Sequence, residues 1–428
     1  MAEDCADNAI SYIAGSIDFL PCTGIIFLEC FLDICSQPHG KSHKKGEIKG
    51  EMAVRQGGQG TEGGDRMTEP QFRNKVVWFS FFFSLLVVWV HSYNAQMFLG
   101  ICGETAEVYL TEHWIGDRFG QIAVPGFFMI SGYLFYRDFD WNLLAGKWKR
   151  RISSVLVPYI LWNFLYYMGY VVGSRLTGIS TIVGKGVVPF SLPALTDAVI
   201  NYTYNYVFWY LCQLIMLILL APLLYPVLKC LWSRILLFAI LWYAVWKNID
   251  LIPLNSDALI YYALAGSLAL DRQRKKNQKN QKNQKNGQKR EPFVPIPERS
   301  WNIRRGLVGV LFLFWGIWFY GFGLRTAFIP GFVISRLFAV SGLWLMVPGE
   351  WLPPAYPFMH CNFFLYATHF AVVRFINKAS ALILPASRWT PLVLYLIMPV
   401  IVLAICGTAS WILKRFSPLL WRMLNGGR

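Results

Sequence analysis

Residues 75–95 read KVVWFSFFFSLLVVWVHSYNA, and this stretch decides the fold. No charge interrupts it from Val76 to Val90. A helix needs about 20 mostly apolar residues to cross a bilayer, so the stretch predicts a membrane span. His91 lies inside it, where hydrocarbon offers an imidazole no partner. Histidine is also the side chain best suited to proton transfer near neutral pH, so we expect His91 to face a cavity or a reaction site.

Composition extends this prediction to the whole chain. The protein has 428 residues, of which 55% are hydrophobic, 17% aromatic and only 15% charged. Soluble domains carry about 25% charged residues. The 18 Trp and 21 Tyr are typical of a protein whose aromatic rings collect at membrane interfaces. The sequence therefore predicts an all-α polytopic membrane protein embedded in a lipid bilayer.

Apolar segments recur along the chain from residue 75 onward. They predict a bundle of about ten transmembrane helices at residues 75–95, 119–136, 152–173, 206–228, 233–248, 255–270, 304–323, 327–346, 361–382 and 391–413. The fifth and sixth segments are short for a span and could be partly interfacial.

Charge orients these segments. The net charge is +16, and cations gather in every second connection, most densely in the Gln-Lys-Asn repeats of residues 271–303. Positive connections stay inside, so we expect a multi-pass protein of the cell (inner) membrane with both termini cytoplasmic. The basic stretch has no interleaved aromatic residues for stacking bases. We therefore interpret it as a solvated cytoplasmic loop near anionic lipid head groups, and expect no nucleic-acid partner.

Three regions divide the chain. Residues 1–66 are Gly-rich and broken by polar residues, and we expect an unstructured extension whose natural start is Met67 or Met52. Residues 67–418 hold the transmembrane domain, and residues 419–428 form a cytoplasmic tail. The nine cysteines show no CxxC pair and no Cys/His spacing, so the sequence predicts neither a metal site nor a disulfide framework.

A cluster of cations enters the third predicted span. Lys147, Lys149, Arg150 and Arg151 precede Val155-Leu156-Val157-Pro158. The cluster could be a positive anchor at the inner surface. It could equally bind the phosphates of an acyl donor through Lys147, Arg150 and Arg151, because lysine and arginine both suit phosphate.

Together these pieces resemble the acyltransferase 3 family of integral-membrane acyltransferases. The resemblance rests on His91 ending the first span, Phe127-Phe128-Met129-Ile130-Ser131-Gly132-Tyr133 in the second, and Lys149-Arg150-Arg151 with Val157-Pro158-Tyr159-Ile160-Leu161-Trp162-Asn163 in the third. It continues with Phe208-Trp209-Tyr210-Leu211, Tyr261-Tyr262-Ala263-Leu264-Ala265-Gly266 and Phe363-Phe364-Leu365-Tyr366-Ala367-Thr368-His369. The match runs in order from about residue 70 to 415.

The resemblance implies an enzyme that moves an acyl group, usually acetyl, from a cytoplasmic donor to a hydroxyl of a surface carbohydrate. The donor would be acetyl-CoA, or succinyl-CoA as a variant, with no permanently bound cofactor. The family histidine maps to His91. Two positions depart from the family pattern, since Ser80 and Ser154 stand where many members have arginine. These departures suggest a divergent branch with an exopolysaccharide, glycolipid or small-sugar acceptor.

The chemistry can be stated for the residues themselves. Neutral His91 could take the proton of a sugar hydroxyl as the hydroxyl attacks a thioester, or His91 could itself be acylated. Donors for the oxyanion, or groups that position substrate, could come from Tyr93, Asn94, Ser131 or Tyr133. His91 lies 16 residues after Lys75, about 24 Å along a helix. A cytoplasmic donor must therefore thread its flexible arm into the bundle.

Two further polar residues interrupt apolar runs. Arg336 is costly at mid-membrane, and either serves in substrate positioning or forms a structural ion pair. His369 could be a second catalytic residue or a packing donor. A transporter or flippase would share the helix count and the buried His and Arg, but residues 75–270 and 304–413 show no inverted repeat. A non-catalytic scaffold would leave the buried polar residues unexplained.

Overall fold

The computed structural model describes residues 68–100, 103–180, 184–249, 251, 253–285 and 303–427. These residues contain helices and no strand, with one isolated bridge between Leu251 and Leu254. The predicted all-α class is therefore confirmed. Our expectations for residues 1–66 and for the start at Met52 or Met67 lie outside the described residues.

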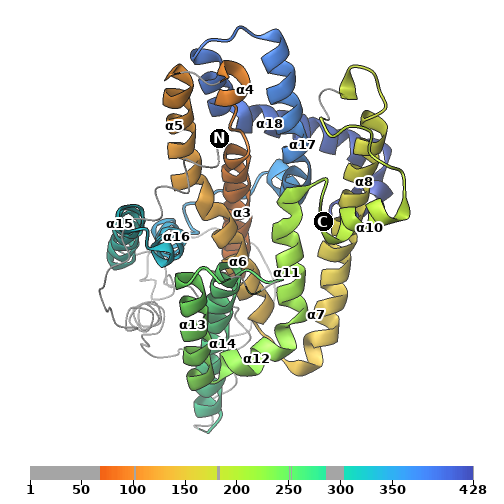
Figure 1. Ribbon diagram of the computed structural model, residues 1–428. Helices are drawn as coiled ribbons and strands as arrows, with labels where there is room; N and C mark the ends of the chain where they lie inside the picture. Colours follow the sequence, from red (N-terminus) through yellow and green to blue (C-terminus); the bar gives the residue numbers. More distant parts are fainter. Residues whose placement is uncertain are drawn as a thin grey trace, which may run out of the picture.

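Sixteen α-helices make up most of the described part of the chain (Figure 1). Eleven of them overlap the predicted spans over several residues, namely α3 (Glu69–Val90), α6 (Ala123–Tyr136), α8 (Val157–Gly173), α11 (Trp209–Leu219), α12 (Ala221–Lys229), α13 (Leu231–Trp246), α14 (Ser256–Lys285), α15 (Ile303–Thr326), α16 (Ile329–Met346), α17 (Asn362–Ile383) and α18 (Trp389–Phe416). The other five are α4 (Ala95–Leu99), α5 (Gly103–Arg118), α7 (Leu144–Arg151), α10 (Leu192–Ile200) and α19 (Pro418–Leu424). Short 3₁₀ turns η1 (Gly120–Ile122), η2 (Trp141–Leu143), η4 (Tyr206–Phe208) and η5 (Pro357–Cys361), and one π turn, η3 (Ile152–Leu156), join some of them.

Each of the ten predicted spans overlaps helix in the structure. Six helical stretches of the described chain are long and apolar enough to cross a membrane, and a seventh counts if α11 and α12, bent by 66°, form one span. The six are Glu69–Leu99, Glu107–Tyr136, Trp141–Gly173, Ile303–Thr326, Ile329–Met346 and Trp389–Phe416. The structure thus confirms a polytopic membrane protein, and the number ten stays a prediction. The remaining helices fall short for physical reasons, since α13 has 16 residues and α14 ends in Lys, Asn and Gln repeats.

Helix α3 lies in the middle of the bundle and ends at His91. Thr68 begins it with a capping box, in which its hydroxyl accepts from Gln71 N and Gln71 reaches back to the Thr68 backbone. The His91 N–H donates to Val87 O and Val88 O, so the helix ends there. Figure 1 shows α3 in the middle of the bundle, beside α6 and α17. His91 therefore lies where several helices meet.

Small residues let α6 and α14 approach closely. A Cβ on Gly132 would collide with the Tyr262 carbonyl oxygen, and one on Gly266 would lie 2.5 Å from the Tyr136 ring. Close backbone approach through glycine is a common way for membrane helices to pack. The contact places Tyr262 of α14 in the interior of the bundle, where it is fully buried.

Some connections are more ordered than we expected. The described part of the basic stretch, residues 271–285, is helical and continues α14, which is consistent with the helix propensity of Lys and Gln. The tail forms α19, whose Trp421 and Leu424 are buried, and the Trp162 indole N–H donates to Leu424 O at 3.0 Å. The region between the first two spans holds α4 and α5.

Helices α15 and α16 form a hairpin at one side of the bundle (Figure 1). Only 22% of the apolar window of α15 is buried inside the protein. Its exposed side chains include Phe314, Ile317 and Trp318. A lipid-facing surface accounts for this apolar exposure, because hydrocarbon solvates such side chains.

Candidate active site

His91 forms one hydrogen bond to a phenol. Its Nδ1 lies 2.9 Å from the Tyr206 hydroxyl, and the two rings meet edge to face with centroids 5.5 Å apart. Tyr206 begins η4, the turn that leads into α11. The histidine ring is half-buried. It is thus held by a polar partner, as a functional imidazole in a membrane span requires.

A second imidazole lies beside the first. His369 of α17 is 1% exposed, and its ring centroid is 5.4 Å from that of His91. The Phe370 ring packs against His91 at 5.8 Å and against Tyr206 at 4.5 Å, which holds the group together. The structure therefore brings together two residues, His91 and His369, that the sequence predicts as catalytic and that lie 278 positions apart.

The hydrogen bonds of His369 assign its tautomer. Its Nδ1 lies 2.5 Å from the Tyr366 carbonyl oxygen. A carbonyl oxygen only accepts, so Nδ1 carries the proton and Nε2 presents a lone pair. Nε2 is buried and has no hydrogen-bond partner among the described residues. An unpaired buried polar atom costs about 1–3 kcal/mol, so this nitrogen is an available acceptor beside His91.

The loop after His91 is clamped from two sides. Asn377 of α17 donates to Ser92 O at 3.3 Å and accepts from the Asn94 side-chain amide at 3.2 Å. Glu112 of α5 is fully buried and accepts from the backbone N–H groups of Asn94 and Ala95. Helix α17 thus carries His369 and also holds the loop that carries His91.

The predicted oxyanion or positioning residues have separate partners in the bundle. The Tyr93 hydroxyl donates to Asp117 at 3.0 Å, and its ring stacks on His113 at 4.1 Å. Ser131 Oγ is 3.5 Å from the Tyr210 hydroxyl. The Tyr133 hydroxyl accepts from Arg272 at 3.1 Å.

Asn94 sits in the clamp, and its side-chain oxygen is buried and unpartnered among the described residues. The structure therefore leaves this set dispersed rather than gathered around His91.

Several tyrosine side chains lie on the side of the histidines that leads toward the cation cluster. The Tyr366 ring lies 5.8 Å from His369 and 5.9 Å from Tyr210. Tyr210 in turn interacts electrostatically with Tyr262, as does Arg151. The Tyr262 hydroxyl is buried without a partner among the described residues. Three buried phenols, those of Tyr366, Tyr210 and Tyr262, thus lie in the apolar interior of the bundle.

The predicted phosphate-binding cations lie on α7. The Lys147 ammonium donates to Phe135 O at 2.6 Å and to Arg137 O at 2.9 Å, at the end of α6. Arg150 is exposed and Arg151 half-buried, and neither forms an ion pair with a carboxylate in the described part of the chain. The two arginines thus keep free donors, whereas Lys147 also ties α6 to α7.

Arg336 lies on α16. Its side chain is half-buried and interacts electrostatically with Tyr261 of α14. No ion pair joins Arg336 to a carboxylate of the described residues, so the structural ion pair that we considered is not seen there.

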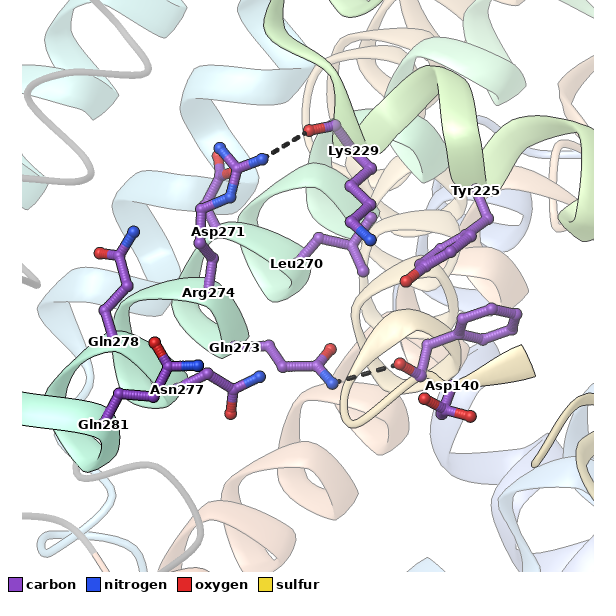
Figure 2. A pocket seen from close by; sticks show the side chains of 11 residues that line it. Asp140, Tyr225, Lys229, Leu270, Asp271, Gln273, Arg274, Asn277, Gln278 and Gln281 are labelled. Atoms are coloured by element: carbon purple, nitrogen blue, oxygen red, sulfur yellow. Dashed lines mark hydrogen bonds between the residues drawn. The ribbon is translucent and has the colours of Figure 1, made fainter. Parts of the chain in front are cut away.

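Two well-defined hollows in the described part of the chain are lined by residues other than the histidines. A polar cavity of about 360 Å³ lies between the ends of α6, α12 and α14 (Figure 2). An apolar crevice of about 80 Å³ lies between α3, α6, α14 and α16, and Arg272 and Tyr133 form part of its wall. The described residues contain no cluster of three or more His, Cys, Asp or Glu that could hold a metal ion.

Comparison with known families supplies the identification. The profile of the acyltransferase 3 family, described as an acyltransferase domain, matches residues 78–411. The chain belongs to the acyltransferase 3 family. No curated protein and no solved structure matches it. The protein is therefore a membrane acyltransferase, and the transporter alternative is set aside.

Two residues of this candidate site escaped the sequence analysis. Tyr206 hydrogen-bonds His91, and Asn377 clamps the following loop. Tyr206 lies two residues before the Phe208-Trp209-Tyr210-Leu211 piece of the resemblance, which was a positional hint. Asn377 gave no such signal, because an asparagine in an apolar helix more often hydrogen-bonds a neighbouring helix than takes part in a site.

Proposed function

We propose that the protein is an O-acyltransferase that moves an acetyl or other short acyl group from acyl-CoA to a hydroxyl of a carbohydrate. The acceptor is an exopolysaccharide, a glycolipid or a lipid-linked sugar. The observation that carries this proposal is the pair of adjacent imidazoles in a membrane acyltransferase, one bound to Tyr206 and the other with an unpaired buried nitrogen.

His91 acts as the base in this scheme. The scheme places the proton of neutral His91 on Nδ1, where it is donated to the Tyr206 hydroxyl. Nε2 then takes the proton of the acceptor hydroxyl while the hydroxyl oxygen attacks the thioester carbonyl. The tetrahedral intermediate then collapses, the carbon–sulfur bond breaks, and the leaving thiolate receives that proton from His91. One ester forms, one thioester is lost, and the imidazole returns to its neutral state.

His369 accepts a hydrogen bond from the acceptor in the same scheme. Its Nδ1 is committed to the Tyr366 carbonyl, so Nε2 can only accept. A hydroxyl on the acceptor that donates to this nitrogen would satisfy an otherwise costly buried atom. The second imidazole therefore favours hydroxyl acceptors and orients them toward His91.

The donor approaches from the opposite end of the bundle. The charge pattern supports a position of α7 at the cytoplasmic face of the inner membrane, with both termini on that side. Arg150 and Arg151 would bind donor phosphates there, since neither pairs with a carboxylate in the described chain. The phenols of Tyr262, Tyr210 and Tyr366 mark the route of the flexible arm to the histidines.

A transfer assay tests the proposal. Purified protein in lipid nanodiscs receives radiolabelled acetyl-CoA and a crude carbohydrate extract, and label in the carbohydrate fraction is counted. We expect transfer with the wild type and a loss of about 10²- to 10⁴-fold with His91→Ala, the usual contribution of a general base. His360→Ala is the matched control, because His360 is exposed on η5.

Three results would count against the proposal. Equal transfer by His91→Ala and the wild type would show that His91 is not the general base. Label that stays on the protein after the acceptor is added would favour an acylated His91 and replace the direct attack. Acetylation of amines in place of hydroxyls would contradict the proposed formation of a carbohydrate ester.

A further inference from the structure

The polar cavity at the end of α14 is built from three elements and lies far from the histidines. Phe139 and Asp140 come from the turn after α6, Tyr225 and Lys229 from α12, and the rest from the second half of α14. Figure 2 shows the Lys229 ammonium and the Tyr225 hydroxyl directed into a space that faces Gln273 and Asn277. Its volume of about 360 Å³ lies within the range of small-molecule sites.

The cavity lining combines cations, carboxamides and an aromatic ring. Its basic residues are Lys229, whose ammonium lies 5.6 Å from the Tyr225 ring centroid, and Arg274, whose guanidinium donates to Lys229 O at 3.1 Å. One lining carboxylate, Asp271, is already neutralised by a two-pronged ion pair with Arg234 at 2.6 and 2.9 Å. The cavity therefore keeps a positive excess over its remaining carboxylate, Asp140.

The carboxamides narrow the choice of ligand. Gln273, Asn277, Gln278 and Gln281 line one wall. Amide groups both donate and accept hydrogen bonds, as the edge of a nucleobase and the hydroxyls of a ribose require. A phosphate would be bound by Lys229 and Arg274. The Tyr225 hydroxyl, which Figure 2 shows directed into the cavity, adds a further hydrogen-bonding group. These groups together fit a phosphorylated nucleoside better than a lipid or a free sugar.

We propose that this cavity binds the adenosine 3′-phosphate end of the acyl-CoA donor, an inference that rests on the proposed function. Lys147 links the cavity to the cation cluster, because its ammonium lies 5.7 Å from the centroid of the lining residue Phe139. Arg151 follows Lys147 by one helical turn on the same face of α7. The diphosphate then lies along Lys147 and Arg151, and the pantetheine arm enters beside Tyr262.

The length of α6 makes this arrangement feasible. Its first turn lies level with the end of α3, where a Cβ on the adjacent Gly120 would collide with Val90. Its 14 residues from Ala123 to Tyr136 rise about 21 Å. An extended phosphopantetheine chain bridges a separation of this order. A nucleotide held at Phe139 and Asp140 could therefore present its thioester at His91.

Equilibrium binding of adenosine 3′,5′-bisphosphate to the full-length protein in nanodiscs tests the inference without any acceptor. We expect wild-type binding, and affinities about tenfold weaker for Lys229→Ala and for Arg274→Ala, the usual effect of losing one charge-assisted hydrogen bond. Lys275→Ala is the matched control, since it removes the same charge from an exposed neighbour on α14 that does not line the cavity. Thermal unfolding confirms that each variant is folded.

Competition between acetyl-CoA and the bisphosphate tests whether the cavity binds the acyl donor. Acetyl-CoA should displace the bisphosphate, and adenosine should bind weakly because it lacks phosphate. The inference is overturned if the wild type does not bind the bisphosphate, if all variants bind it equally, or if acetyl-CoA fails to displace it. Binding with these properties but without acyl transfer would instead count against the proposed reaction alone.

Discussion

At the scale of single residues, the site depends on which atom of each imidazole is already occupied. The Tyr366 carbonyl fixes the proton of His369 on Nδ1, and the Tyr206 hydroxyl occupies Nδ1 of His91. Both Nε2 atoms are therefore left for the reaction. Two neutral bases side by side suit a weak nucleophile such as a hydroxyl, which must lose its proton during attack.

Removing the Tyr206 hydroxyl should slow the acyl-transfer step without weakening the binding of the acyl donor. Tyr206→Phe keeps the ring that packs on Phe370 and deletes the bond that orients His91. We expect kcat to fall about tenfold, the effect of one lost hydrogen bond, with KM for acetyl-CoA unchanged. Steady-state kinetics measure both constants. Tyr356→Phe is the control because Tyr356 is 49% exposed, and an equal fall in that variant would contradict the prediction.

At the scale of elements, α17 positions both histidines. It carries His369 and, two turns later, Asn377, which binds the loop that follows His91. The separation of the two imidazoles is thus set within one rigid helix rather than by two independent loops. Glu112 adds a second anchor through the same loop backbone.

The Asn377 clamp predicts a loss of activity in folded protein. Asn377→Ala removes both hydrogen bonds of the clamp, and we expect kcat to fall about tenfold or more because misplacing a reacting group is costly. Asn377→Asp keeps an acceptor for Asn94 and should be milder. Phe375 lies on the same helix and is 58% exposed, so Phe375→Ala should keep wild-type kcat. Activity equal in all three variants would show that α17 does not position His91.

The α6–α14 contact predicts opposite effects of one substitution at two glycines. Gly132→Ala places a methyl group against the Tyr262 carbonyl, so we expect destabilisation of about 1–3 kcal/mol. Gly169→Ala, on α8, meets nothing within 4 Å and should be neutral or stabilise by up to about 1 kcal/mol, because alanine favours helix. Reversible unfolding in mixed micelles gives both values. A stabilising Gly132→Ala would refute the close contact.

At the scale of the whole molecule, the proposed reaction joins two sides of a membrane. Figure 1 shows α7, α12 and the second half of α14, which carry the cation cluster and most of the cavity lining, toward one end of the bundle, and α4, which follows His91, at the other. Donor and acceptor can therefore arrive from opposite faces. Only a flexible arm has to cross the apolar interior, past the buried phenols.

Orientation is testable by labelling. Cysteine introduced at Lys275 should react with a membrane-impermeant maleimide only after the cells are opened, because basic connections remain in the cytoplasm. Cysteine introduced at Tyr109, which is exposed on α5, should react in intact cells. Labelling in the reverse pattern would invert the topology and place the donor site outside.

The sequence alone determined the class of the fold and located the longer apolar helices, and it singled out His91 as a candidate. Hydrophobic length is a local property, and an apolar run such as Val76–Val90 has few stable forms in a bilayer other than a helix. The same argument flagged His91, His369 and Arg336 as costly, but it could not say which of them meet.

Only the tertiary structure decided the partners. Contacts between α3, η4 and α17 join residues more than 100 positions apart, and no local pattern encodes such a pairing. Packing placed Tyr206 and Asn377 at the site, left Tyr93, Ser131 and Tyr133 with separate partners, and turned Lys147 toward the end of α6. A local sequence fixes which groups must be satisfied, whereas only the packed bundle fixes which neighbour satisfies them.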